Sequence, residues 1–210
     1  MKEFENLVSL LESANSDNVM LGLQIARNYK KEFFDYFGCK LEVLEDLTDL
    51  LVQNNIWNAK GSIFEIELLG LSKIILSKIP KSVFILKKIK ALCFLACGLH
   101  EIPKEIGELK HLQTFFVPCN KLKSIPAEIG QLKNLKSLFL SNNQLQSLPA
   151  EIGNLINLGE LYLNNNQFQS LPKGIDKLTN LRKLNIRNNK IPTKEIAHLQ
   201  KMLPNCKIIT

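Results

Sequence analysis

Apolar residues recur at a fixed interval through most of this chain. The interval is 23 residues, because 89 − 66 and 181 − 158 both equal 23. The equivalent residues are Ile66, Ile89, Leu112, Leu135, Leu158 and Leu181. A unit written from residue 135 has apolar residues at positions 1, 4, 6, 11, 14, 18 and 21, with Asn at position 9 and Pro at position 15. Self-similarity of this length indicates stacked structural units, since one unit cannot bury its own leucines.

Each unit combines two local patterns. The alternation of Leu135, Leu138 and Leu140 predicts a short strand. The segment LPAEIGNL at 148–155 has the spacing of a tight helical or irregular return. Stacked units place the strands in a parallel sheet on one face and the returns on the other. The pattern therefore predicts an α/β solenoid.

The string LxxLxLxxNxLxxLPxxIGxLxx is nearly complete at 135–157 and 158–180 and resembles the 23-residue leucine-rich repeat. The resemblance covers residues 66–192, and the LPxxIGxL return is similar to that of free-standing bacterial members and of eukaryotic Ras-pathway scaffolds. It implies a right-handed, horseshoe-shaped solenoid whose parallel strands line a concave surface that binds partners.

Two unit positions carry structural residues. A buried side-chain amide needs hydrogen-bond partners, because an unpaired one costs about 1–3 kcal/mol. We expect each amide at position 9 to bond to the main chain of its own coil and the next, which makes an asparagine ladder and not a site. The ladder comprises Asn120, Asn143, Asn166 and Asn189. We expect Gly107, Gly130 and Gly153, at position 19, to occupy turns with positive φ.

Three segments are predicted. Residues 1–62 form a helical N-terminal cap, 63–192 the repeats and 193–210 a C-terminal cap. Helical spacing of apolar residues within 1–60 indicates three amphipathic helices, with Trp57 at their junction with the repeats. A cap is favoured over a membrane or partner helix, because residues 1–65 hold 6 basic and 11 acidic residues, a net charge of −5.

The C-terminal segment has two predicted elements. TKEIAHLQKML predicts a helix that ends before Pro204. NCKII predicts a last edge strand with Cys206 and Ile208 facing inward. It resembles the C-terminal caps of the bacterial members, and with both ends capped we expect a complete protein.

Composition narrows the location. Five cysteines, an odd number, indicate reduced thiols in a cytoplasm. No segment has the apolar length of a bilayer span, and acidic residues interrupt the N-terminus where a signal peptide would need an apolar core. We expect a cytoplasmic bacterial protein that acts as a monomer, away from membranes.

No pattern of a catalytic, metal or cofactor site emerges from the sequence. His100, His111 and His198 do not cluster, and the motifs of phosphate-binding loops and of nucleophile elbows are missing. Cys93 and Cys119 could face solvent, but no motif supplies a base. We expect no catalysis, no metal and no cofactor.

The predicted strands send unit positions 3, 5 and 7 to the exposed face of the sheet. Position 5 carries aromatic residues in three consecutive units, and position 7 includes Pro118. Exposed aromatic rings beside arginine are typical of binding hot spots. The alternative is that the rings only stack across the strands. The candidate partner-binding residues are Leu68, Leu95, Phe116, Phe139, Tyr162, Asn164, Lys183, Asn185 and Arg187.

The size and charge of this face indicate the class of partner. A face of six strands fits a folded protein or an extended peptide better than a small molecule. Arg182, Lys183 and Arg187 would suit an acidic patch on that partner. The function that the sequence favours is a non-catalytic scaffold for protein–protein interaction. Residues 66–210 hold 21 basic and 9 acidic residues, so the alternative is a binder of acidic polymer or nucleic acid. Nucleic acid is disfavoured, because the charges circle the coil.

Overall fold

The computed structural model describes residues 68–72 and 75–210. The predicted helices within residues 1–60 and Trp57 lie outside this range. Residues 70–72, 75–79 and 90–210 belong to one compact unit, whereas 68–69 and 80–89 belong to another. The first of these units contains most of the predicted repeats.

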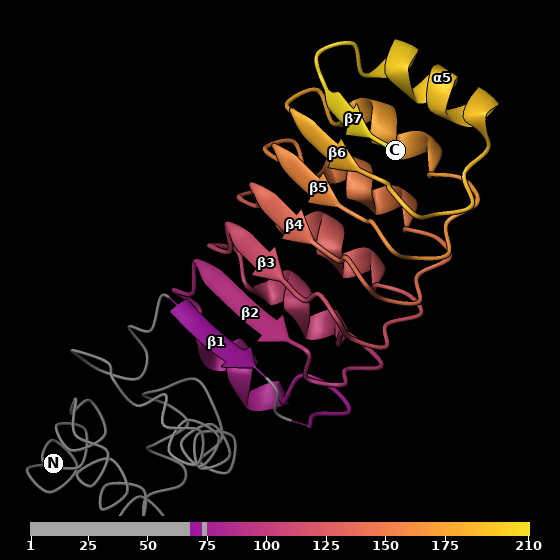
Figure 1. The fold of residues 1–210 in the computed structure, drawn as a ribbon. Coiled ribbons are helices and arrows are strands. Elements are labelled where there is room, and N and C mark those ends of the chain that lie inside the picture. Colours follow the sequence, from indigo (N-terminus) through magenta and orange to yellow (C-terminus); the bar gives the residue numbers. More distant parts are fainter. Residues whose placement is uncertain (1–67, 73–74) are drawn as a thin grey trace, which may run out of the picture. The chain divides into compact units, whose positions relative to one another are not determined.

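The strands form a single sheet in chain order (Figure 1). Neighbours from β2 to β7 pair in parallel, and equivalent residues of successive units lie opposite one another, as Phe116 and Phe139 do. The strands are β1 Leu68–Ser72, β2 Ala91–Leu95, β3 Thr114–Phe116, β4 Ser137–Phe139, β5 Glu160–Tyr162, β6 Lys183–Asn185 and β7 Lys207–Ile209. The parallel sheet predicted from the repeat is confirmed.

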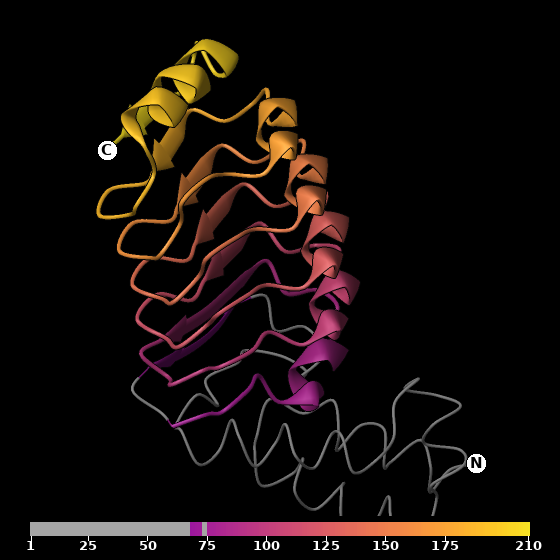
Figure 2. The same cartoon turned by 90° about the vertical axis from the view of Figure 1, so that its right-hand side faces the viewer.

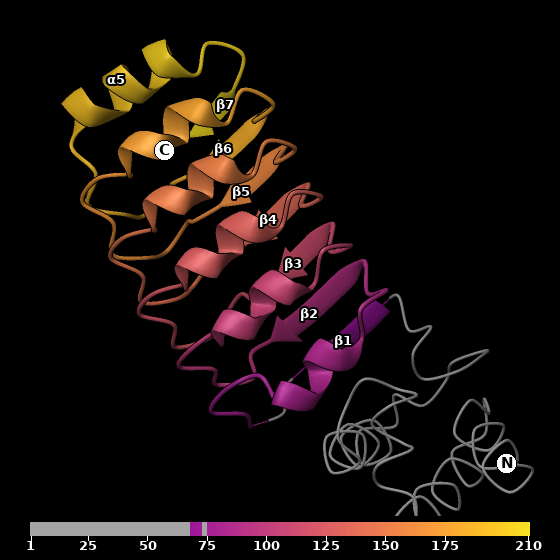
Figure 3. The ribbon, with the colours of Figure 1, turned by 180° about the vertical axis from the view of Figure 1, so that it is seen from behind.

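The returns are short 3-10 helices, each entered from a proline. Pro126, for example, has φ −72° and ψ 152°, an extended conformation. Proline suits this place because it has a fixed φ and the first turn needs no N–H from it. The 3-10 helices are η2 Lys81–Ile85, η3 Lys104–Glu108, η4 Ala127–Gln131, η5 Ala150–Asn154 and η6 Lys173–Lys177. Figure 3, the view from behind, shows η3 to η6 side by side in front of the strands.

Figure 2 shows the strands on one side of the coils and the 3-10 returns on the other. The buried apolar residues of the repeats lie between these two layers. Leu135, Leu138 and Leu140, at positions 1, 4 and 6, have no exposed surface. Leu145 at position 11 and Ile152 at position 18 are equally buried. Stacked coils thus bury the side chains that one coil alone would leave in water.

The position-19 glycines are required by close packing and not by their φ angle. Among the described residues, Gly98 is the glycine with positive φ, so the prediction for Gly107, Gly130 and Gly153 is wrong. A Cβ at Gly107 would lie 2.9 Å from the carbonyl oxygen of Glu128 in the next 3-10 helix. Glycine is needed because adjacent returns approach at main-chain distance.

The asparagine ladder is present, but it runs in the opposite direction from the prediction. Asn143 Oδ1 accepts a hydrogen bond from Leu122 N at 3.1 Å, and its Nδ2 donates to Val117 O at 3.0 Å. Both atoms belong to the preceding coil, and Nδ2 also donates to Leu140 O in its own coil. Asn120, Asn166 and Asn189 repeat this arrangement. Each amide therefore joins its own coil to the one before it.

The C-terminal helix α5 spans Thr193–Met202, and β7 follows it. Leu199 and Leu203 are buried, and β7 pairs with β6. Cys206, Ile208 and Ile209 are all half-buried, so burial does not test the predicted inward orientation of Cys206 and Ile208. Burial raises the pKa of the Cys206 thiol to about 11.

Candidate functional site

The exposed face of the sheet carries the side chains at unit positions 3 and 5. In β3, Phe115 is fully buried, whereas its neighbours Thr114 and Phe116 are half-exposed. The strands β4, β5 and β6 show the same alternation. We call this surface the strand face. The asparagine ladder and the buried leucines lie on the other side of these strands and hold their main chain in place.

Phe116, Phe139 and Tyr162 form a row of rings on the strand face, which we call the ring stripe. The three residues occupy the same register in β3, β4 and β5. The ring centroids of Phe116 and Phe139 lie 5.1 Å apart with the planes at 53°, and those of Phe139 and Tyr162 lie 4.6 Å apart, stacked at 16°. All three residues are half-exposed. The rings thus contact each other and also present apolar surface to solvent.

Lys183 ends the ring stripe. Its Nζ lies 4.9 Å from the centroid of the Tyr162 ring, within the range of a cation–π contact. A hydrogen bond and an electrostatic interaction with Tyr162 raise the pKa of Lys183, and the nearby Glu160 carboxylate adds to this effect. Sequence reasoning placed Lys183 on this face but missed its contact with the ring, because the contact depends on the side-chain rotamer.

The other sequence-predicted residues lie around the ring stripe. Leu95 and Asn164 are half-exposed, and Asn164 Oδ1 accepts a 2.7 Å hydrogen bond from the hydroxyl of Ser141. Asn185 is half-exposed, and its Oδ1 accepts a bond from the backbone N–H of Arg187 at 3.2 Å. Arg187 is exposed. The backbone of Leu68 lies in β1, but its side chain lies outside the description.

One member of the position-7 column does not follow the prediction. Pro118 is buried and is not part of the strand face. Beyond the short strands of these coils the chain turns, so alternation no longer determines which side a residue faces. The predicted column therefore has a gap between Leu95 and Ser141.

Sequence reasoning missed Lys207 as a residue of the strand face. The pairing of β7 with β6 places Lys207 opposite Lys183, and its side chain is exposed. The available signal was the predicted inward orientation of Cys206 and Ile208, which by alternation sends Lys207 outward.

A row of amides follows the strands. Asn142, Asn165 and Asn188 all have left-handed backbone, with φ of 55°, 57° and 55°. Asn165 Nδ2 donates to Asn142 Oδ1 at 2.8 Å, and Asn188 Nδ2 donates to Asn165 Oδ1 at 2.6 Å. Asparagine suits these turns because it tolerates positive φ better than most side chains. The row holds the edge of the strand face in place.

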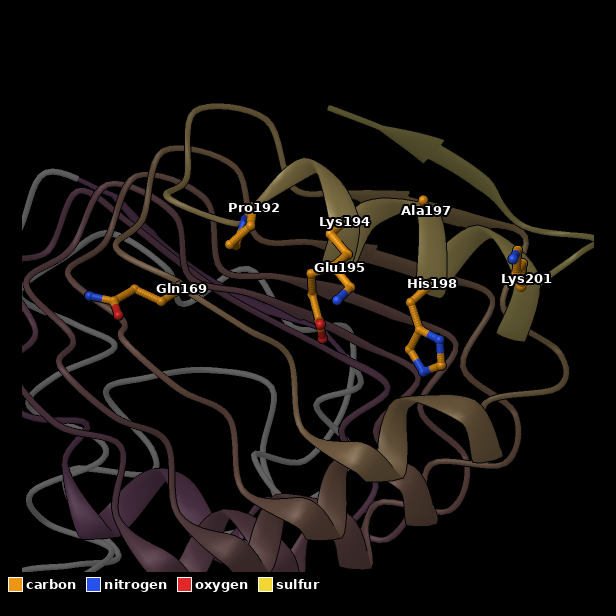
Figure 4. Close-up of a pocket in the computed structure, with 7 residues that line it drawn as sticks. All are labelled: Gln169, Pro192, Lys194, Glu195, Ala197, His198 and Lys201. Carbon is orange, nitrogen blue, oxygen red and sulfur yellow. The ribbon is translucent and has the colours of Figure 1, made fainter.

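A hollow of about 570 Å³ lies beside α5, away from the strand face (Figure 4). Its walls include Gln169, Lys194 and Lys201, while Glu195 and His198 extend from α5 toward the coil below. A smaller hollow of about 260 Å³ shares Glu195 and His198. Each hollow is lined by His198, by Glu195 and by at least one lysine, and neither lining includes a Ser, Thr or Cys side chain.

The sequence singled out the thiols of Cys93 and Cys119 as possible nucleophiles. Cys93 is half-buried, and burial, followed by the nearby Cys97, raises the pKa of its thiol, which disfavours a reactive thiolate. Cys119 is exposed, as expected. No group of three His, Cys, Asp or Glu side chains in residues 68–72 and 75–210 could hold a metal ion. Within the same residues, no helix has the length and apolarity of a membrane span.

Comparison with known proteins gives one family. The family model described as "Leucine-rich repeat region" matches residues 81–207. No curated protein matches the chain significantly.

Three solved structures are similar. A leucine-rich repeat protein of Leptospira interrogans is 32% identical with a TM-score of 0.55, over 69% of this chain and 49% of that one. The ectodomain of the Arabidopsis thaliana receptor kinase GASSHO1/SCHENGEN3 is 34% identical with a TM-score of 0.54, over 59% and 15%. The Arabidopsis receptor kinase HAESA is 29% identical with a TM-score of 0.52, over 60% and 22%. The match thus spans about half the length of the Leptospira protein.

Proposed function

The chain belongs to the leucine-rich repeat family, and from this membership we propose that it binds a protein or an extended peptide on its strand face and catalyses no reaction. Domains of this family generally mediate protein–protein interaction and are generally non-catalytic. The single observation that assigns the proposed binding to the strand face is the ring stripe.

The ring stripe has the properties of an interface. Phe116, Phe139 and Tyr162 are held in register by strand pairing, so little conformational entropy is lost when a partner covers them. Stacking between the rings contributes about 0.2–1 kcal/mol per pair, yet it leaves their outer surface in water. An exposed apolar row with a polar border favours a docking surface over a purely structural stack.

The dimensions of the face suit a macromolecule. From β2 to β7 there are five strand spacings, which span about 24 Å. An interface of about 800 Å² per partner fits on such a surface. The HAESA structure is described as a complex with the peptide hormone IDA and the co-receptor SERK1, so a similar fold accommodates a peptide partner.

We extend the proposal to the organisation of the chain. Residues 1–62 and 193–210 cap the repeats at 63–192, and the protein acts as a monomer in a cytoplasm. The cysteines Cys93, Cys119 and Cys206 are present as thiols and not as disulfides, which supports a reducing compartment.

The test compares partner recovery by crosslinking and pull-down from native cell extract. A variant combining Phe116→Ala, Phe139→Ser and Tyr162→Ala removes the rings and should lose most of the partner that the wild type recovers. The control, Ile156→Ala, truncates an exposed apolar side chain that lies off the strand face. Circular dichroism and thermal unfolding check that both variants fold. Unchanged recovery by a folded triple variant contradicts the proposal.

A further inference from the structure

The charge of the strand face changes along the sheet. The ring stripe occupies β3 to β5. Beyond it along the sheet, Lys183 lies in β6, Lys207 lies in β7, and Arg187 follows the end of β6 by two residues. Lys183 and Lys207 lie opposite one another in the pairing of β6 with β7. Among the described residues of this face, Glu160 is the acidic side chain next to these cations, and it pairs in register with Lys183.

The three cations differ in their surroundings. Lys183 contacts the Tyr162 ring and is close to the Glu160 carboxylate, so part of its charge is already compensated within the sheet. Arg187 and Lys207 are exposed, and Arg187 is held at its backbone N–H by Asn185. Two exposed cations next to the ring stripe attract an anionic group of a partner to this end of the strand face.

We propose that the partner is a peptide segment with a carboxylate side chain spaced from its apolar anchor, and that Arg187 and Lys207 recognise this carboxylate. The inference rests on the proposed function, because the anchor is the group that covers the ring stripe. β7 lies two strand spacings beyond β5 and three beyond β4, which is about 10 Å and about 14 Å. An extended chain rises about 3.3 Å per residue, so the carboxylate lies about three or four residues from the anchor.

The test is a selection of peptides from a displayed library of random linear sequences on the full chain, followed by affinity measurements with the synthesised peptides. Selected sequences should share an aromatic or large aliphatic residue and an Asp or Glu about three or four positions apart. The double variant Arg187→Glu and Lys207→Glu should bind these peptides about tenfold more weakly. A peptide with the acidic residue replaced by Ala should show no such difference between the wild type and the double variant.

The matched control is Lys121→Glu with Lys123→Glu, which makes the same change in net charge at exposed turn residues off the strand face. The recognition of a carboxylate is contradicted if this control loses as much affinity as the double variant, because the effect would then come from overall charge, as for an acidic polymer.

The variants separate the two proposals. If removal of the rings abolishes binding and the double variant binds normally, carboxylate recognition is wrong and the ring stripe stands. If removal of the rings leaves binding unchanged, the proposed function is wrong. A selection that yields no peptide whose binding depends on the strand face contradicts both.

Discussion

At the residue scale, the buried amide of Asn143 joins two coils at once. It accepts a hydrogen bond from Leu122 N and donates to Val117 O, both in the preceding coil, and it donates to Leu140 O in its own coil. No water reaches this side chain easily, since it is 8% exposed. The amide therefore stabilises the stack where strand pairing ends.

Asn143→Ala should lower the free energy of unfolding by about 2–3 kcal/mol, because it leaves the buried N–H of Leu122 without a partner. Denaturant unfolding measures this loss. The control is Asn157→Ala, which removes a 2.8 Å hydrogen bond to Lys133 O at an exposed position and should cost about 0.5 kcal/mol. Equal losses in the two variants would show that burial of the ladder does not matter.

Gly130→Ala should destabilise the protein by about 1–3 kcal/mol, because the added methyl group would meet the main chain of Glu151 in the next 3-10 helix. Gly159→Ala is the matched substitution, since its Cβ would lie 3.7 Å from the nearest atom, Lys136 O. It should leave stability unchanged or raise it slightly by restricting the unfolded chain. Thermal unfolding compares the stability of both variants with that of the wild type. A Gly130→Ala protein as stable as the wild type would refute the explanation by close approach of the main chains.

Sequence spacing predicted Asn143 as a buried amide that bonds to main chain, but not the coil that it contacts, and it assigned the wrong role to Gly130. A fixed interval shows that Asn143 and Gly130 have equivalents in other coils, yet it does not show which neighbouring coil each contacts. The side of the contact depends on how one coil sits on the next, which only coordinates provide. The spacing also does not show which residue of a unit adopts positive φ. We expected positive φ at the glycines of position 19, whereas the structure has it at position 8, for example at Cys119 and Asn142.

At the scale of elements, the repeat pattern predicted the order and pairing of the strands because alternation and stacking follow from burial. It did not predict that the returns are 3-10 helices, because spacing over a few residues does not distinguish helix types. It also missed the register of β7, and with it the place of Lys207.

Cys206, just before β7, reports on this last element. With its pKa raised to about 11 by burial, its thiolate fraction near neutral pH should be about 100-fold below that of an unperturbed thiol. Alkylation by iodoacetamide, followed at this residue by mass spectrometry, should be slower by the same factor than in the unfolded chain.

The direction of the pH effect on stability follows from the same shift. The folded state holds the proton of the Cys206 thiol more tightly than the unfolded state does. The contribution of this thiol to the free energy of unfolding is therefore complete below pH 9.0 and is lost as the pH rises toward about 11. Alkylation of Cys206 at the rate of the unfolded chain would contradict burial of the β7 end.

At the scale of the whole molecule, the residues that support the repeats are distinct from the residues that we propose contact a partner. The 3-10 returns, the ladder and the leucines hold successive strands in register, and the side chains of the strand face are left to vary from coil to coil. The sequence predicted the ring stripe because alternation determines which side of a strand a residue faces. It did not predict the contact of Lys183 with Tyr162 or the row of amides, because these depend on side-chain conformation.

The most direct measurement of the central claim is site-specific photocrosslinking to a peptide selected on the full chain. A photoreactive phenylalanine analogue replaces Phe139 in one protein and Ile156, which is 55% exposed, in another. If the peptide docks on the ring stripe, the protein with the analogue at position 139 should form an adduct, and the protein with the analogue at position 156 should form none. An adduct from position 156 alone would place the binding surface elsewhere on the repeats.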